Sequence, residues 1–92
     1  MNKTTETFTI EVGGKTGVIT KPNFAQKASA MASMYTAEGN IDMASSGRVL
    51  LTMCWKEGDD AIRNDDDLAF SASIKLWEEF LSNFGGAELK KN

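Results

Sequence analysis

Residues 7–20 read TFTIEVGGKTGVIT, and this stretch decides the fold of the chain. Apolar and polar side chains alternate over Thr7–Val12, which is typical of a β-strand with one buried face. Gly13 and Gly14 tolerate the positive φ angles of a tight primed turn, so Lys15–Thr20 is predicted to return as a second strand. The expected register pairs Phe8 with Ile19, Ile10 with Gly17, and Val12 with Lys15.

A helix is expected directly after this hairpin. Pro22 and Asn23 mark the change from strand to helix, because proline cannot donate to a β-ladder but fits a helix start. Apolar residues then recur at helical spacing, which predicts a helix from Phe24 to about Ala37. Its expected apolar face comprises Phe24, Ala28, Met31, Met34 and Tyr35.

A second helix is expected to begin after Asp42, whose carboxylate can accept hydrogen bonds from the free N–H groups of a first turn. Gly47 lies inside this helix, where glycine costs about 1 kcal/mol relative to alanine. Its presence there predicts the close approach of a neighbouring element. The expected buried stripe is Met43, Gly47, Leu50, Leu51 and Cys54, with Val49 and Met53 widening it.

The segment Lys56–Asn64 is predicted to be a loop anchored by the apolar pair Ala61-Ile62. A last helix should begin at Asp65 or Asp66, because acidic residues cap the first turn and complement the helix dipole. Gly85-Gly86 is expected to end it. Its predicted apolar stripe is Ala69, Ser73, Leu76, Trp77, Phe80 and Phe84.

The predicted fold class is therefore α+β: an N-terminal β-hairpin followed by three α-helices packed in one small domain. A length of 92 residues suits one domain, residues 1–92, with flexible ends expected at 1–6 and 87–92. So small a core leaves stability marginal, which makes docking onto a partner or self-association as a homo-oligomer energetically useful.

Composition excludes several classes of function. The net charge of -3, with scattered Lys and Arg, argues against binding of a nucleic-acid backbone, which requires a basic patch. No apolar run reaches the roughly 20 residues that span a bilayer, so neither export nor membrane anchoring is expected. A single cysteine forms no internal disulfide, and a reducing, cytoplasmic compartment fits best.

No catalytic, cofactor or metal site is predicted. Gly14-Lys15-Thr16 copies the end of a phosphate-binding loop, but Thr9 stands where that motif needs glycine, and a strand follows instead of a helix. The aspartates between positions 59 and 67 lack the alternating spacing of a calcium loop. Cys54 has no histidine to activate it, because the chain contains none. A non-enzymatic protein without cofactors is therefore expected.

Methionine and aromatic residues form the one candidate binding set. Methionine adapts to irregular neighbours and is favoured at promiscuous binding surfaces, although most such residues belong to a core. A groove between the first two predicted helices is the hypothesis drawn from this enrichment. The candidate partner-binding residues are Met31, Met34, Tyr35 and Trp55.

The order of features resembles small phage and prophage tail assembly chaperones. The residues that carry the resemblance are Pro22-Asn23-Phe24, the run Val49–Trp55, the run Gly58–Ile62, and Asn64-Asp65-Asp66 before an apolar helix. The resemblance implies a non-enzymatic protein of the host cytoplasm, which coats hydrophobic helical segments of the tape-measure protein while tail-tube subunits assemble around it. It brings no catalytic residues and no defined site motif.

Two other functions fit the same sequence. An acidic inhibitory or regulatory protein could occupy the basic nucleic-acid channel of a partner, since clustered aspartates imitate phosphate charge. A minor structural subunit of a phage tail has the same size and composition as a chaperone. Salt-sensitive binding would favour the acidic module, and presence in purified virions would favour the structural subunit.

Overall fold

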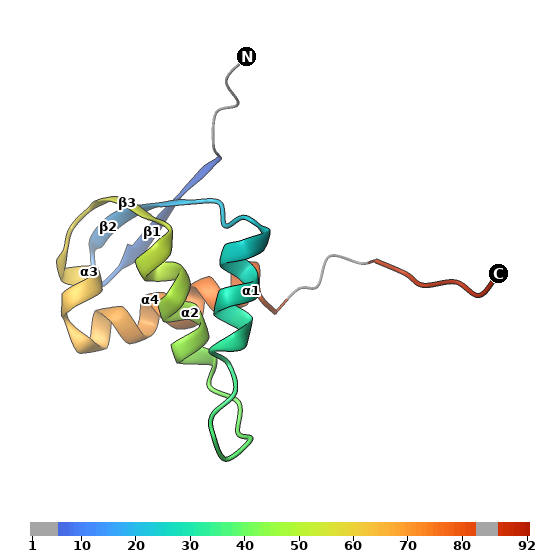
Figure 1. Ribbon diagram of the computed structural model, residues 1–92. Coiled ribbons are helices and arrows are strands. Elements are labelled where there is room, and N and C mark those ends of the chain that lie inside the picture. Colours follow the sequence, from blue (N-terminus) through green and yellow to red (C-terminus); the bar gives the residue numbers. More distant parts are fainter. Residues whose placement is uncertain (1–5, 83–86) are drawn as a thin grey trace.

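The computed structural model describes residues 6–82 and 87–92. Over these residues the chain is α+β, with a three-stranded antiparallel sheet and four helices (Figure 1). The sheet lies at one end of the molecule, and the helices gather beneath it and to its side. The α+β class and the N-terminal hairpin agree with the prediction, whereas the third strand and the fourth helix were not predicted.

Strands β1 (Thr7–Val12) and β2 (Lys15–Thr20) form the hairpin in the predicted register. Phe8 pairs with Ile19, Ile10 with Gly17, and Val12 with Lys15. Gly13 has a φ of 56° and Gly14 a φ of 78°, as a primed two-residue turn requires. Alternation and the glycine pair were therefore enough to predict this element.

Helix α1 (Phe24–Ala32) begins with a capping box, in which Asn23 and Gln26 exchange hydrogen bonds between side chain and backbone. It ends five residues before the predicted Ala37. The chain leaves the helix because its next backbone groups pair across a protruding loop, where Asp42 donates its N–H to the Met34 carbonyl and Tyr35 bridges to Ile41 (Figure 1).

The predicted apolar face of α1 is also wrong in part. Phe24 is 90% exposed and Ala28 is exposed, whereas Ala30 is fully buried. The physical reason is a neighbour on α2: the Ser46 hydroxyl donates a hydrogen bond of 2.8 Å to the Ala30 carbonyl. The face of α1 that holds Ala30 therefore packs against α2, and Phe24 lies off this face in solvent.

Helix α2 (Met43–Met53) starts at the predicted cap, where the Asp42 side chain accepts the Ser45 N–H. Its buried face comprises Ser46, Gly47, Leu50 and Leu51, and Cys54 follows at the C-cap. Met43, at 42% exposed, does not belong to this face, because it precedes the point where α2 meets its neighbours.

The segment predicted as a loop, Lys56–Asn64, holds all but the first residue of strand β3 (Trp55–Gly58) and the whole of helix α3 (Ala61–Asn64). Strand β3 pairs with β2, and Gly58, at a φ of 133°, approaches the Gly17 backbone so closely that a side chain would not fit. Ile62 on α3 is fully buried, as an apolar anchor should be. The loop prediction failed because the partner of β3 lies far away in the sequence.

Helix α4 (Asp66–Phe80) begins as predicted, with the Asp65 carboxylate accepting the Leu68 N–H. Its last turn closes where Leu81 and Ser82 both donate their N–H groups to the Trp77 carbonyl. The helix therefore ends before the predicted stop. Phe84 and Gly85-Gly86, which were assigned to its stripe and its end, lie outside the described residues.

The core lies where α2 crosses α4 and where the sheet covers these helices. It contains one face of the hairpin together with the inward residues of the helices: Ile10, Val12, Ile19, Ala30, Leu50, Leu51, Cys54, Ile62, Ala69, Ala72, Leu76 and Leu81. In the described part of the chain, the helices are all too short or too polar to cross a bilayer.

Candidate binding groove

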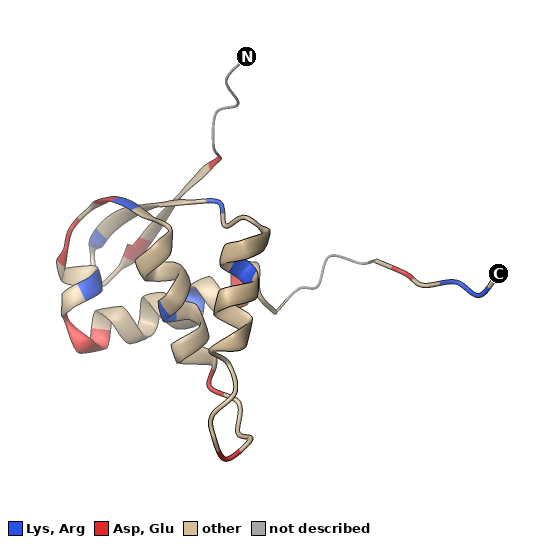
Figure 2. Cartoon of the chain, viewed as in Figure 1, with Lys and Arg blue, Asp and Glu red and all other residues tan. Residues whose placement is uncertain are grey.

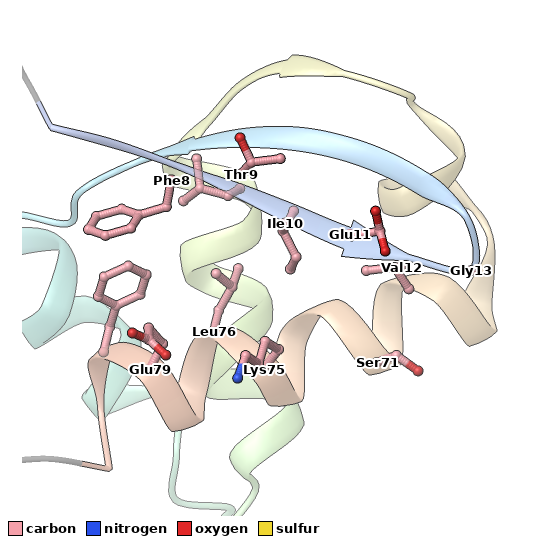
Figure 3. A pocket seen from close by; sticks show the side chains of 12 residues that line it. Phe8, Thr9, Ile10, Glu11, Val12, Gly13, Ser71, Lys75, Leu76 and Glu79 are labelled. Atoms are coloured by element: carbon pink, nitrogen blue, oxygen red, sulfur yellow. The ribbon is translucent and has the colours of Figure 1, made fainter.

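An open hollow of about 590 Å³ separates strand β1 from helix α4. Figure 3 shows β1 above and α4 below, with Ile10 and Leu76 pointing toward one another across the space. Ser71, Lys75 and Glu79 follow one another at four-residue spacing along one rim of α4. We call this space the β1–α4 groove; its remaining lining residues are Phe8, Thr9, Glu11, Val12, Gly13, Ile19 and Phe80.

Two phenylalanines close one end of the β1–α4 groove. The ring centroids of Phe8 and Phe80 are 5.3 Å apart and the ring planes are inclined by 70°, which is the edge-to-face arrangement that aromatic pairs favour. Phe8 is still 36% exposed, although alternation places it on the face that β1 turns toward the core. An aromatic surface is therefore accessible at this end of the groove.

The backbone of β1 is open along its outer edge. Within the described residues the strand order is β1-β2-β3, so β1 has a strand neighbour on one side only. Lys21 donates its N–H to the Glu6 carbonyl at 2.8 Å, and hydrogen-bonded pairs alternate along an antiparallel ladder. The N–H and C=O groups of Thr7, Thr9 and Glu11 consequently point away from β2.

The two edge strands of the sheet differ in how well they are protected from pairing with a strand of another chain. Strand β3 is four residues long, carries Lys56 and Glu57, and pairs with β2 through an irregular register. Short length, charge and irregularity are the usual protections of an edge strand. Strand β1 is six residues long, carries Glu11 as its one charged residue, contains neither lysine nor proline, and pairs in an unbroken register. The open edge is therefore β1.

Charged residues frame the β1–α4 groove without engaging one another. The Glu11 side chain points away from α4, and Lys75 and Glu79 lie along the opposite rim (Figure 3). Ion pairs among residues 6–82 and 87–92 lie elsewhere, at Lys21–Glu6, Arg63–Asp60 and Lys90–Glu88. Figure 2 shows that the strongest acidic concentration lies instead at the start of α4.

The four residues predicted to bind a partner lie in different surroundings. Met34 is buried, with its sulfur 3.4 Å from the Trp77 indole nitrogen, and Met31 is half-buried against the core. Tyr35 is 60% exposed in the loop after α1. Trp55 is half-buried in the sheet, where the Arg63 guanidinium lies 4.7 Å from its ring centroid.

A smaller hollow of about 380 Å³ lies beside α1 and α2, where the binding groove was expected. It is lined by Ser33, Ser45, Arg48, Val49, Thr52 and Met53, and so contains none of the four predicted residues. Sequence reasoning missed the β1–α4 groove, because it placed Phe8 on a buried face. The sequence of β1 gave no signal of an edge, because regular alternation without lysine or proline fits a strand in the interior of a sheet equally well.

Cys54, Asp60 and Asp65 could in principle react or bind a metal, but each is either buried or engaged in a local contact of the fold. Burial raises the pKa of the Cys54 thiol, which is only 1% exposed, and a hydrogen bond with Thr20 opposes this shift. Asp60 pairs with Arg63, and Asp65 caps α4. No three His, Cys, Asp or Glu side chains converge as metal ligands in residues 6–82 and 87–92.

Comparisons with protein families, with curated proteins and with solved structures gave no match to this chain.

Proposed function

We propose that this protein is a non-enzymatic binding module that holds an apolar segment of another protein in the β1–α4 groove. The observation that carries the proposal is the accessible Phe8–Phe80 pair at the end of an open hollow of about 590 Å³. When a partner covers apolar surface of this kind and removes it from water, the free energy of binding becomes more favourable. A domain with a small core also benefits from that burial.

The proposed class of partner rests on the family resemblance of the sequence. The resemblance to tail assembly chaperones favours an apolar segment of a tape-measure or tail protein, bound in the host cytoplasm before the tail is complete. The acidic regulatory module is a weaker candidate, because Asp59, Asp60 and Asp65 are already engaged in local hydrogen bonds. A structural tail subunit would use the same groove in the finished particle.

Two exposed phenylalanines provide a matched test. Phe8 lines the β1–α4 groove, whereas Phe24 is 90% exposed on α1, outside the residues that line it. Isotope-labelled protein would be titrated with overlapping peptides from a phage tape-measure protein, and backbone amide shifts would be followed. We expect shifts concentrated on β1 and α4, lost in Phe8→Ser and retained in Phe24→Ser. Equal loss in both variants, or no shift with any peptide, would contradict the proposal.

A further inference from the structure

We propose that the segment held in the β1–α4 groove binds as an extended strand, with apolar side chains at alternate positions. It would pair along the outer edge of β1, which has no strand neighbour among the described residues. This inference rests on the proposed function and specifies the conformation and pattern of the partner. It differs from the helical partner that the resemblance implies.

The N–H and C=O groups along the outer edge of β1 favour a bound segment in the strand conformation over a helical one. Thr7, Thr9 and Glu11 each direct one N–H and one C=O group toward the outer edge, as the Lys21–Glu6 hydrogen bond shows. A helix has already satisfied its own backbone, so covering this edge with a helix would remove these groups from water without partners. Each unpaired buried group costs about 1–3 kcal/mol. An extended segment supplies the missing donors and acceptors.

The groove fixes the side-chain pattern of the added strand. Side chains of a strand alternate between faces, and Phe8 and Ile10 of β1 point toward α4 whereas Thr9 and Glu11 point away (Figure 3). An added strand would share this pleat. Every second residue would therefore enter the apolar hollow beside Leu76 and Phe80, and the residues between them would face solvent.

Charge adds one further requirement. Glu11 lies on the solvent face of β1, and its carboxylate has no ion-pair partner in the part of the chain that the structure describes. Cross-strand pairs of opposite charge contribute about 0.2–1 kcal/mol, and like charges are unfavourable. A lysine or arginine in the partner, opposite Glu11, is therefore favoured over an acidic residue.

A second copy of this chain fits the same edge less well. Neighbouring strands lie about 4.8 Å apart, whereas packed helices need about 8–10 Å between their axes. Because α4 lies beneath β1, a second chain paired through its own β1 would bring its α4 against Lys75 and Glu79 (Figure 3). A lone extended segment carries no such helix.

Two peptide libraries of equal composition test the inference. One library of nine-residue peptides alternates Val, Ile, Leu or Phe with Thr or Lys. The other places the same residues at helical spacing. We expect immobilised wild-type protein to retain the alternating library and not the helical one. Retention of the helical library alone would overturn strand pairing and leave the proposed function standing; retention of neither would overturn both.

Substitutions of Thr9 test whether backbone hydrogen bonds, and not apolar contacts alone, contribute to peptide binding. Thr9→Pro removes only an outward N–H, since Thr9 does not exchange hydrogen bonds with β2, and proline is tolerated in edge strands. We expect Thr9→Pro to weaken binding of an alternating peptide at least about tenfold, and Thr9→Ala, which keeps the outward N–H, to weaken it far less. Circular dichroism and urea unfolding would show that both variants are folded.

The peptide offers an independent check. Methylation of its amide nitrogens that face β1 should abolish binding, and methylation of the amides that face away should not. If Phe8→Ser abolishes binding while Thr9→Pro and both methylated peptides behave normally, strand pairing is wrong and the apolar groove is right. A concentration-dependent dimer that Thr9→Pro dissolves would assign this edge to a second copy and overturn the inference.

Discussion

Gly47 on α2 lies directly against the backbone of Ser73 on α4, with no room between them for a Cβ atom. Ser73 is 2% exposed, so the contact lies in the interior of the helical layer. The predicted close approach at Gly47 is confirmed, and its neighbour is now identified. The glycine lets α2 and α4 meet backbone to backbone.

Gly47→Ala should destabilise the fold strongly. The added methyl group overlaps the Ser73 carbonyl, so α2 and α4 must separate and lose packing along their whole crossing. We expect the free energy of unfolding, measured with urea, to fall by more than about 2 kcal/mol. Thr52→Ala, at an exposed position on α2, is the control and should change it by less than about 0.5 kcal/mol. Equal midpoints for the two variants would refute the tight crossing.

Ser46→Ala should loosen α1. Its hydroxyl donates the buried hydrogen bond to the Ala30 carbonyl, which joins α2 to α1. We expect a loss of about 0.5–1.5 kcal/mol in the free energy of unfolding and faster amide hydrogen exchange in α1. Ser29→Ala, exposed on α1, should leave exchange unchanged. Unaltered exchange in Ser46→Ala would show that α1 is held by other contacts.

Asp42 should make stability depend on pH in the acid range. The Ser45 hydroxyl, and then the Ser45 backbone N–H, lower the pKa of Asp42 below its ordinary value of 3.8. The unfolded chain therefore takes up this proton more readily than the folded chain. The stabilisation is present above the ordinary pKa and is lost as pH falls through the folded pKa.

Urea midpoints measured from about pH 6 to about pH 3 would check this dependence. We expect the midpoint of the wild type to fall more steeply than that of Asp42→Asn, whose amide does not titrate. Ser45→Ala removes the hydroxyl hydrogen bond and should flatten the wild-type curve. Parallel curves for all three proteins would mean that Asp42 titrates alike in both states.

Cys54 should react slowly with thiol reagents in the folded protein. Burial raises the pKa of its thiol and hides the sulfur, so both the thiolate fraction and its accessibility are low. We expect alkylation by iodoacetamide to be at least about a hundredfold slower in buffer than in urea, because the reaction requires opening of the fold. Comparable rates in the two conditions would place Cys54 at the surface.

The parts of the fold that were predictable depend on local chemistry. The hairpin follows from alternation at Thr7–Val12 and from two glycines in its turn, and the starts of α2 and α4 follow from Asp42 and Asp65. These signals act between residues close in the sequence. Their strength does not depend on the rest of the chain.

The parts that were missed depend on distant partners. The β3 sequence Trp55–Gly58 has no clear alternation and becomes a strand because β2, including Gly17, lies beside it. The apolar periodicity of α1 continues past Ala32, but hydrogen bonds across the following loop override it. The β1–α4 groove exists because β1 lies at an edge, and strand order is a global property.

The unequal borders of the sheet also limit how far this protein can polymerise. A fibril that grows by strand pairing needs two edge strands on every subunit that can each pair with another chain. Each added subunit then exposes an edge strand with which the next subunit can pair. The edge strand β3 is short, charged and irregularly paired, so it does not pair readily with a further subunit and growth stops there. Concentrated protein should therefore stop at small assemblies and resist seeded fibre growth.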